Sequence, residues 1–264
     1  MRLIINSACA GIRTSSRYFL LPGILLLSIA IILPDVATAQ DKIYNEYRVT
    51  IVPTYAVSKK VFLTTYLGYV NIPSQNRVNY YLGAPLLVTY RLSPVVEFMA
   101  GGFLVFSRLN GDKEYNEFRP LAGVKLYLPN NNHMNIYNWT RYELRCFYYD
   151  DKSLNNVKNR LRNRIGLEFP LSKKAWQPKS IYALTDFEFF YTIEKGYFDR
   201  FRERLGIGYV IDKHWRAEMI YHIQLLKSED KNPEWTNNIW RLNIKWQIPH
   251  KTHPPVPHPI DVDD

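Results

Sequence analysis

The chain has 264 residues, with 34 Lys and Arg against 24 Asp and Glu and a net charge of +10. Aromatic residues make up 15% of it, including 20 tyrosines. This excludes a disordered chain, because disordered chains lack the apolar groups needed to build a core. Two cysteines exclude a disulfide-rich scaffold and any four-cysteine zinc site. The positive charge alone would suggest nucleic acid or anionic lipid as a partner.

Residues 1–39 are predicted to be a secretory signal peptide. Three arginines precede an apolar run over residues 18–33, and the Ala-Thr-Ala sequence at 37–39 predicts cleavage between Ala39 and Gln40. An uncleaved membrane anchor is the alternative, but the run is short for a bilayer span and contains Pro22. Cleavage leaves a chain of net charge +8 outside the cytoplasm, so we expect no nucleic-acid partner. It also leaves Cys146 as the only cysteine, so no intramolecular disulfide is expected.

Polar and apolar residues alternate along nearly all of the chain from residue 40 to 249, which predicts β-strands. The clearest segment carries Arg160, Arg162 and Arg164 on one face and Leu161 and Ile165 on the other. A helix would place Arg162 among the apolar side chains. In chain order, eleven strands are predicted over residues 46–51, 61–70, 77–90, 95–106, 117–124, 139–149, 158–169, 186–189, 199–211, 215–225 and 239–248. No helix of ten residues or more is evident.

The predicted connections alternate in length. Residues 57–60, 92–94, 128–132 and 211–214 are short connections, whereas 110–115, 150–157, 194–198 and 227–236 are longer and polar. This alternation is typical of outer-membrane barrels, in which the short turns face the periplasm. Single-chain bacterial barrels of this kind have an even number of strands. We therefore expect one strand to be missed or split, with the discrepancy in residues 75–90.

Alternation alone does not say which face meets lipid and which meets water. Three features favour a membrane: aromatic residues near the strand ends, Arg and Glu on successive polar faces, and strands long enough to cross a bilayer. The expected fold is all-β, a transmembrane antiparallel up-and-down β-barrel of about 10–12 strands in the cell outer membrane. The expected organisation is a signal peptide over 1–39, the barrel over 40–249 and a Pro/His-rich tail over 250–264. A soluble lipocalin-like barrel is the alternative fold.

Seven short motifs in a fixed order carry a resemblance to a known family. They are 117–120 (EFRP), 141–145 (RYELR), 159–164 (NRLRNR), 186–190 (DFEFF), 198–202 (FDRFR), 206–209 (GIGY) and 213–218 (KHWRAE). The array resembles domain-of-unknown-function family 2490, a set of uncharacterised bacterial proteins regarded as outer-membrane β-barrels, over roughly residues 41–248. The resemblance implies an architecture and a compartment, and it supplies no activity.

If the charged faces point inward, they form a network of ionised side chains in the lumen. Asp186 and Glu188 lie on a strand between two arginine-rich strands, so each carboxylate is expected to meet guanidinium groups on both sides. The interpretation favoured here is an ion-paired core that keeps a narrow barrel closed; the alternative is an excess of positive charge that selects anions. The predicted network comprises Arg119, Arg141, Glu143, Arg145, Arg160, Arg162, Arg164, Glu168, Asp186, Glu188, Arg200, Arg202, Arg204, Arg216 and Glu218.

An enzyme is the other class of function considered. Outer-membrane lipid hydrolases pair a serine with a histidine base, and His222 is the one histidine expected mid-strand. No Gly-x-Ser-x-Gly motif occurs and no serine is evidently placed beside it, so we expect no catalytic residues. The tail histidines His250, His253 and His258 are irregularly spaced, so we expect no metal and no cofactor. The expected partners are outer-membrane lipid, lipopolysaccharide and the barrel-assembly machinery.

Overall fold

The computed structural model describes residues 43–73, 77–83, 87–109, 114–129, 134–172, 176–229 and 231–248. The predicted signal peptide, its cleavage site at Ala39 and Gln40, and the predicted tail over 250–264 lie outside the described residues. Within the described part the protein is all-β. None of its residues forms a helix that could span a bilayer.

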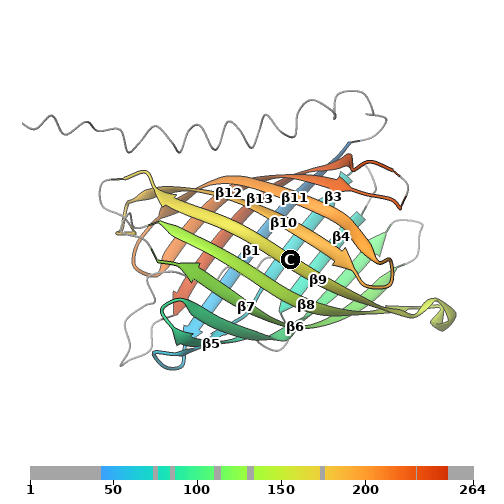
Figure 1. Cartoon of the computed structure of the whole chain (residues 1–264), viewed down its shortest axis with the longest axis horizontal. Helices are drawn as coiled ribbons and strands as arrows, with labels where there is room; N and C mark the ends of the chain where they lie inside the picture. Colours follow the sequence, from blue (N-terminus) through green and yellow to red (C-terminus); the bar gives the residue numbers. More distant parts are fainter. Residues whose placement is uncertain are drawn as a thin grey trace, which may run out of the picture. The chain divides into compact units, whose positions relative to one another are not determined.

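Thirteen strands form one sheet (Figure 1). A short 3-10 turn lies at Lys152–Leu154, between β8 and β9. The strands are β1 (Tyr44–Ala56), β2 (Val61–Thr64), β3 (Leu67–Ile72), β4 (Arg77–Gly83), β5 (Leu87–Ser93), β6 (Val96–Leu109), β7 (Tyr115–Leu128), β8 (Asn135–Tyr149), β9 (Asn156–Pro170), β10 (Ile181–Thr192), β11 (Tyr197–Val210), β12 (Trp215–Leu226) and β13 (Glu234–Ile248).

In two places, two of these short strands together make one interrupted strand of the barrel. Both β2 and β3 pair with β1, and both β4 and β5 pair with β6, so each pair crosses the sheet once. The barrel therefore has eleven strands around its circumference. The predicted antiparallel barrel of about 10–12 strands is confirmed. The region expected to hold the discrepancy, residues 75–90, contains the interrupted β4–β5 strand.

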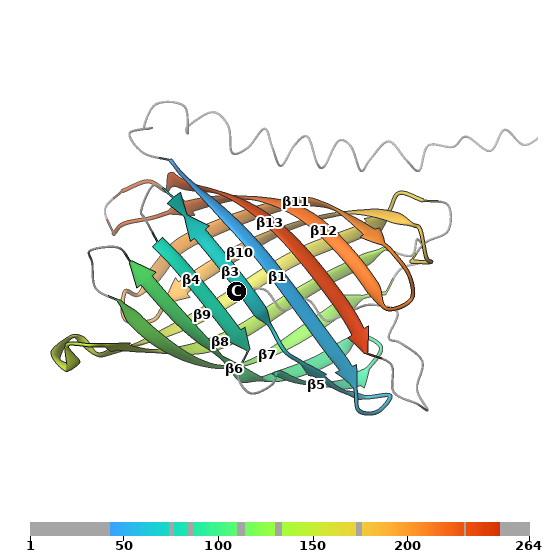
Figure 2. The ribbon, with the colours of Figure 1, turned by 180° about the vertical axis from the view of Figure 1, so that it is seen from behind.

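The barrel closes through a parallel pair. β1 pairs with β13 from Tyr44 opposite Asn237 to Tyr55 opposite Ile248, whereas every other pairing in the described sheet is antiparallel. Figure 2 shows β1 in blue beside β13 in red, with both arrowheads pointing the same way. The expectation of an even strand number was wrong, because an odd number of alternating strands makes the first and last strands run in the same direction and a parallel ladder can join them.

The connections fall at two ends of the barrel. We call rim A the end of the barrel at which β1, β5, β7, β9, β11 and β13 end and β2, β6, β8, β10 and β12 begin. Rim B is the opposite end, at which β1, β4, β7, β9, β11 and β13 begin. The strands that the parallel pair brings together thus begin at rim B and end at rim A. Residues 43 and 248 lie at opposite rims as a consequence.

Burial along the strands follows the period of two that the sequence predicts. In β10, for example, every second residue from Tyr182 to Thr192 is buried and the residues between them are more exposed. Because successive side chains of a strand point to opposite faces, the buried set lines the interior of the barrel and the other set covers its outside.

The turn between β11 and β12 is held by one carboxylate. Asp212 accepts hydrogen bonds from the backbone N–H groups of His214 at 2.6 Å and Trp215 at 2.8 Å. These two bonds favour the ionised carboxylate and so lower the pKa of Asp212, and the bond from His214 has the larger effect. An aspartate in this position stabilises a turn by bonding its own following backbone.

Replacing Asp212 by alanine is expected to lower the unfolding temperature at neutral pH. The pKa of Asp212 is lower in the folded chain than in the unfolded chain, where it is about 3.9. Its stabilisation is therefore complete above the unfolded pKa and is lost as the pH falls through the folded pKa. The difference between Asp212→Ala and the parent should shrink between about pH 5 and pH 3 in melts followed by circular dichroism. Asp150→Ala, at an exposed bend, is the control, and an unchanged difference at low pH would contradict the assignment.

Candidate functional site

The interior side chains are segregated along the barrel axis. An apolar plug occupies the half nearer rim A, and its members are Val52, Ala56, Phe62, Tyr66, Leu87, Met99, Phe103, Leu121, Tyr137 and Trp139 in one cluster and Tyr182, Leu184, Val210 and Ile220 in another. Tyr66 and Phe103 meet edge to face with ring centroids 5.5 Å apart. Ionised side chains predominate from mid-barrel toward rim B, although the ion pairs Glu218–Lys245 and Glu97–Arg91 also lie near rim A. The two halves together put both apolar and charged groups inside one bore.

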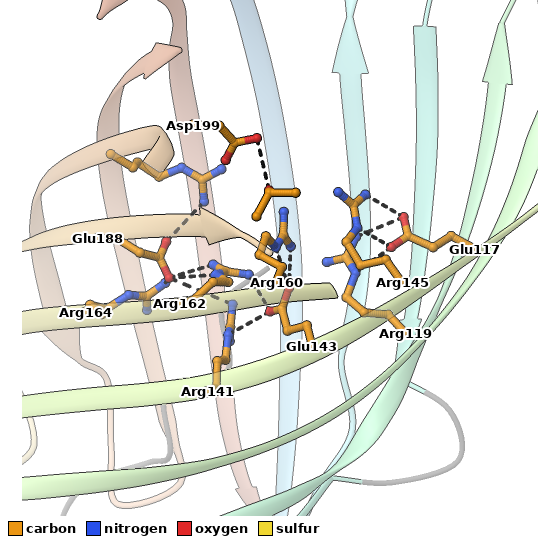
Figure 3. Close-up of polar contacts among 12 residues, drawn as sticks. Glu117, Arg119, Arg141, Glu143, Arg145, Arg160, Arg162, Arg164, Glu188 and Asp199 are labelled. Carbon is orange, nitrogen blue, oxygen red and sulfur yellow. Dashed lines mark hydrogen bonds and ion pairs between the residues drawn. The ribbon is translucent and has the colours of Figure 1, made fainter. Parts of the chain in front are cut away.

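Glu188 lies at the centre of the charged half, which Figure 3 draws. Its Oε1 accepts hydrogen bonds from Arg162 Nη2 at 2.7 Å and Arg164 Nη2 at 3.0 Å. Its Oε2 lies 3.6 Å from Arg202 Nη1 on the opposite neighbouring strand. The register explains this arrangement, because Glu188 on β10 is directly opposite Arg164 on β9 and Arg202 on β11. One carboxylate thus serves guanidinium groups from the strands on both sides.

Glu143 on β8 is the second centre. Its Oε1 lies 2.8 Å from both Arg141 Nε and Arg162 Nη1, and its Oε2 accepts from Arg160 Nε at 2.8 Å. Arg162 therefore bridges Glu143 and Glu188 (Figure 3). Carboxylates that accept from several guanidinium groups form strong, directional contacts.

Two further carboxylates complete the cluster. Glu117 on β7 accepts from Arg119 Nε at 2.8 Å and from Arg145 Nε at 2.6 Å. Two guanidinium groups thus share this one carboxylate. Asp186 accepts from Arg204 Nε at 2.7 Å. We call Glu117, Arg119, Arg141, Glu143, Arg145, Arg160, Arg162, Arg164, Asp186, Glu188, Arg202 and Arg204 the charge cluster.

An aromatic ring lies among the arginines. The guanidinium carbons of Arg160, Arg162, Arg200 and Arg202 lie 5.2, 4.4, 5.5 and 5.1 Å from the ring centroid of the buried Phe190. Such contacts stabilise cations where water is excluded. Arg200 forms no ion pair with any described residue, and its nearest acid along the chain, Asp199, accepts from Thr192 and Lys195. Arg200 is therefore a further cation beside the charge cluster, whose eight arginines each contact one of its four carboxylates.

Three predicted network residues lie away from the charge cluster, near rim A. Glu218 accepts from Lys245 Nζ at 2.7 Å and from the Tyr182 hydroxyl at 2.5 Å. Glu168 accepts from the amide of Asn135 at 2.8 Å. Arg216 lies over the Trp176 ring at 5.7 Å. The structure therefore brings twelve of the fifteen predicted residues together, from mid-barrel toward rim B, and separates these three from them. Among the twelve, Arg200 is joined to the others only through its contact with Phe190.

Several polar groups inside the barrel were not among the predicted network. Arg48 donates to Glu46 at 2.6 Å on β1, and Arg91 Nη2 lies 2.5 Å from Glu97, whose other oxygen accepts from Tyr127. Arg241 donates to the Tyr66 hydroxyl at 2.6 Å, which links the charged half to the plug. The alternation had already placed Glu46, Arg48 and Arg241 on inward faces, whereas Arg91 and Glu97, which lie on strands with few charges, were missed.

His222 is fully buried on the inward face of β12, opposite Arg204. Neither of its ring nitrogens makes a hydrogen bond to a described residue, so no serine within that part of the chain is paired with it. No group of three or more His, Cys, Asp and Glu side chains within the described ranges is arranged to hold a metal ion.

The fold and the interior define a class: a closed antiparallel β-barrel whose bore holds buried Arg–Glu ion pairs. The chain belongs to the family described as "Protein of unknown function (DUF2490)", whose sequence model matches residues 74–236. This match confirms the family resemblance drawn from the seven motifs. The comparison with curated proteins found no match, and neither did the comparison with solved structures.

Proposed function

We propose that the chain is an outer-membrane protein, exported through a signal peptide cleaved between Ala39 and Gln40, that acts as a narrow structural or binding barrel with an Arg-rich, ion-paired lumen. The outer face supports the membrane part. Tyr55, Tyr90 and Tyr209 are exposed near rim A, and Tyr47 and Tyr148 near rim B. Between these bands most exposed side chains are aliphatic, such as Ile51, Leu161 and Leu242, with Tyr142 and Trp240 as aromatic exceptions. Aromatic bands on either side of an apolar zone are the surface that a bilayer requires.

The filling of the bore supports a closed barrel, and this is the observation that carries the proposal. The plug blocks the rim A half with packed aromatic and aliphatic side chains, including the fully buried Trp139 and Phe103. Ions cross such a filled constriction poorly, because they would lose their hydration there. The ionised side chains that lie beside the plug are themselves paired, Lys245 with Glu218 and Arg91 with Glu97. The ion pairs of the charge cluster then hold the other half together.

We expect the purified full chain to show no steady conductance in planar bilayers. Removing plug side chains with the Tyr66→Ala and Phe103→Ala pair should open a leak, because the two rings contact each other inside the bore. The outward Phe98→Ala is the matched control and should stay silent, since that ring is exposed on the outside. Steady channels in the parent protein would contradict a closed barrel. Release of the chain from membranes without detergent would contradict the membrane placement.

An anion-selective pore is the second candidate, and one observation favours it. Among the described buried residues that face the bore there are twelve Lys and Arg against seven Asp and Glu, since the buried Glu203 points outward. A surplus of arginine in a pore attracts anions. If the parent protein conducts, a reversal potential in a chloride gradient that reports anion selectivity would support this candidate over the closed barrel. We propose no catalytic role for His222, and we propose lipid, lipopolysaccharide and the barrel-assembly machinery as the partners.

A further inference from the structure

One acidic side chain lies on the outside of the barrel at mid-strand. Glu203 is the seventh of the fourteen residues of β11. Among the described strand residues that point outward and lie more than two positions from a strand end, it is the only Asp, Glu, Lys, Arg or His. Glu203 is not among the predicted site residues, because the alternation assigns its neighbours Arg202 and Arg204 to the polar face and puts Glu203 on the apolar face.

The register fixes the direction of this side chain. Glu203 is directly opposite Phe187 on β10 and Ile223 on β12. The neighbours of Phe187 along β10, Asp186 and Glu188, both bond arginines inside the barrel. Directly opposite residues of an antiparallel pair point to the same face, so Glu203 points outward with Phe187.

The carboxyl group of Glu203 is buried and incompletely bonded. The residue is only 4% exposed, and its Oε1 has no hydrogen-bond partner among the described residues. The hydroxyl of Thr185 is also buried without a described partner. Thr185 lies one diagonal step away on the same outer face, since it is opposite Leu205. Buried polar atoms in native proteins nearly always have partners, so two neighbouring exceptions point to a missing one.

Aromatic rings border these two groups on the side toward rim B. Phe189 and Phe201 meet edge to face with centroids 5.8 Å apart, and Tyr191 and Phe198 do so at 5.3 Å. Phe198 and Phe201 join the two pairs at 6.4 Å. This patch combines an acid, a hydroxyl and the faces of apolar rings, a combination that suits a cation carrying a hydrocarbon chain.

We propose that Glu203 and Thr185, on the outer face of β10 and β11, form a binding site for the protonated amine of a hydrophobic amine, whose chain lies over the rings of Phe189, Phe198 and Phe201. The inference rests on the proposed membrane placement. An unpaired carboxylate in hydrocarbon is costly, and a ligand that brings its own positive charge removes that cost by forming an ion pair in a medium of low dielectric constant. Alkyl chains without a cation offer the carboxyl group no such partner.

Labelling with dicyclohexylcarbodiimide tests the proposal on the full chain in lipid nanodiscs. A protonated carboxyl adds across the N=C=N group: its oxygen bonds the central carbon and its proton goes to one nitrogen. Transfer of the acyl group to nitrogen then gives a stable N-acylurea, with the whole reagent retained. We expect one adduct, located on Glu203 by mass spectrometry. Dodecylamine at about ten times its Kd should slow the labelling about tenfold, because about one site in eleven is then empty.

Variants and a neutral ligand make the outcome decisive. Glu203→Gln should abolish the adduct, and the migration of this variant in detergent gels should still change on heating, as expected of a folded barrel. Glu234→Gln, at the exposed start of β13, should leave labelling unchanged. Thr185→Val should keep the adduct and weaken protection by the amine severalfold. Labelling at another acid, or equal protection by dodecanol, would overturn the proposal. Failure of the membrane placement itself would show separately, as a chain soluble without detergent.

Discussion

Replacing Glu188 by glutamine is expected to lower the free energy of unfolding by about 3–5 kcal/mol, the usual cost of breaking a buried ion pair by removing one partner. The change keeps the size of the side chain and removes its charge. Arg162 and Arg164 then lose their common acceptor at 2.7 and 3.0 Å, and Arg202 loses an ion pair at 3.6 Å. Urea titration of the full chain in detergent micelles, followed by tryptophan fluorescence, measures the loss.

Two further variants make this prediction specific. Glu188→Asp keeps the charge and shortens the reach, so it should fall between the parent and Glu188→Gln. Glu229→Gln, in the exposed connection at rim B, should unfold like the parent. If Glu188→Gln also unfolded like the parent, the charge cluster would not be what holds the rim B half of the bore together.

The barrel could be predicted from the sequence because its strands are amphipathic in the simplest way. Arg160, Arg162 and Arg164 occupy alternate positions, and the structure turns all three inward, where they meet carboxylates of β8 and β10. The position of Asp186 and Glu188 between two arginine-rich strands was also readable, since strands adjacent in sequence are adjacent in an up-and-down barrel. Local periodicity and chain order together were therefore sufficient to predict that part of the site.

The closure and the axial segregation could not be predicted in the same way. Whether β1 meets β13 depends on a pairing between residues almost 200 positions apart, and no local pattern encodes it. The plug residues lie at the start of some strands and at the end of others. That Phe62, Phe103 and Tyr66 belong to one cluster is therefore evident only once the register of the barrel is known. Glu203 shows a third limit, since a residue with the wrong polarity for its face is invisible to an argument that assigns faces by polarity.

Replacing Gly208 by alanine is expected to destabilise the barrel by about 1–3 kcal/mol or more, as overpacking of a filled interior does. The ring of Tyr182 lies directly over Gly208, its cross-strand neighbour, and a Cβ there would come within 2.1 Å of Tyr182 Cζ. The ring is not free to move aside, because its hydroxyl donates to Glu218 Oε1 at 2.5 Å. The same oxygen accepts from Lys245 at 2.7 Å, so displacing the ring disturbs that ion pair as well.

A double-mutant cycle separates this clash from any general effect of alanine on the strand. In a Tyr182→Ala background the added methyl group meets no ring, so Gly208→Ala should cost little there, and the two changes should be far from additive. Gly102→Ala is the milder comparison and should cost less, because its Cβ would approach Arg119 O and Phe118 Cε2 to 3.3 Å, a tight contact but a much smaller overlap than at Gly208. Equal costs for Gly208→Ala with and without the tyrosine would contradict the packing of that ring on the glycine. The same reasoning applies to Gly166 on β9, which Tyr137 covers in the same way, with 2.3 Å between the added Cβ and the ring. A strong coupling at Gly208 would thus indicate that two glycine–tyrosine contacts, one between β10 and β11 and one between β8 and β9, hold these strands in register near rim A, where the plug packs.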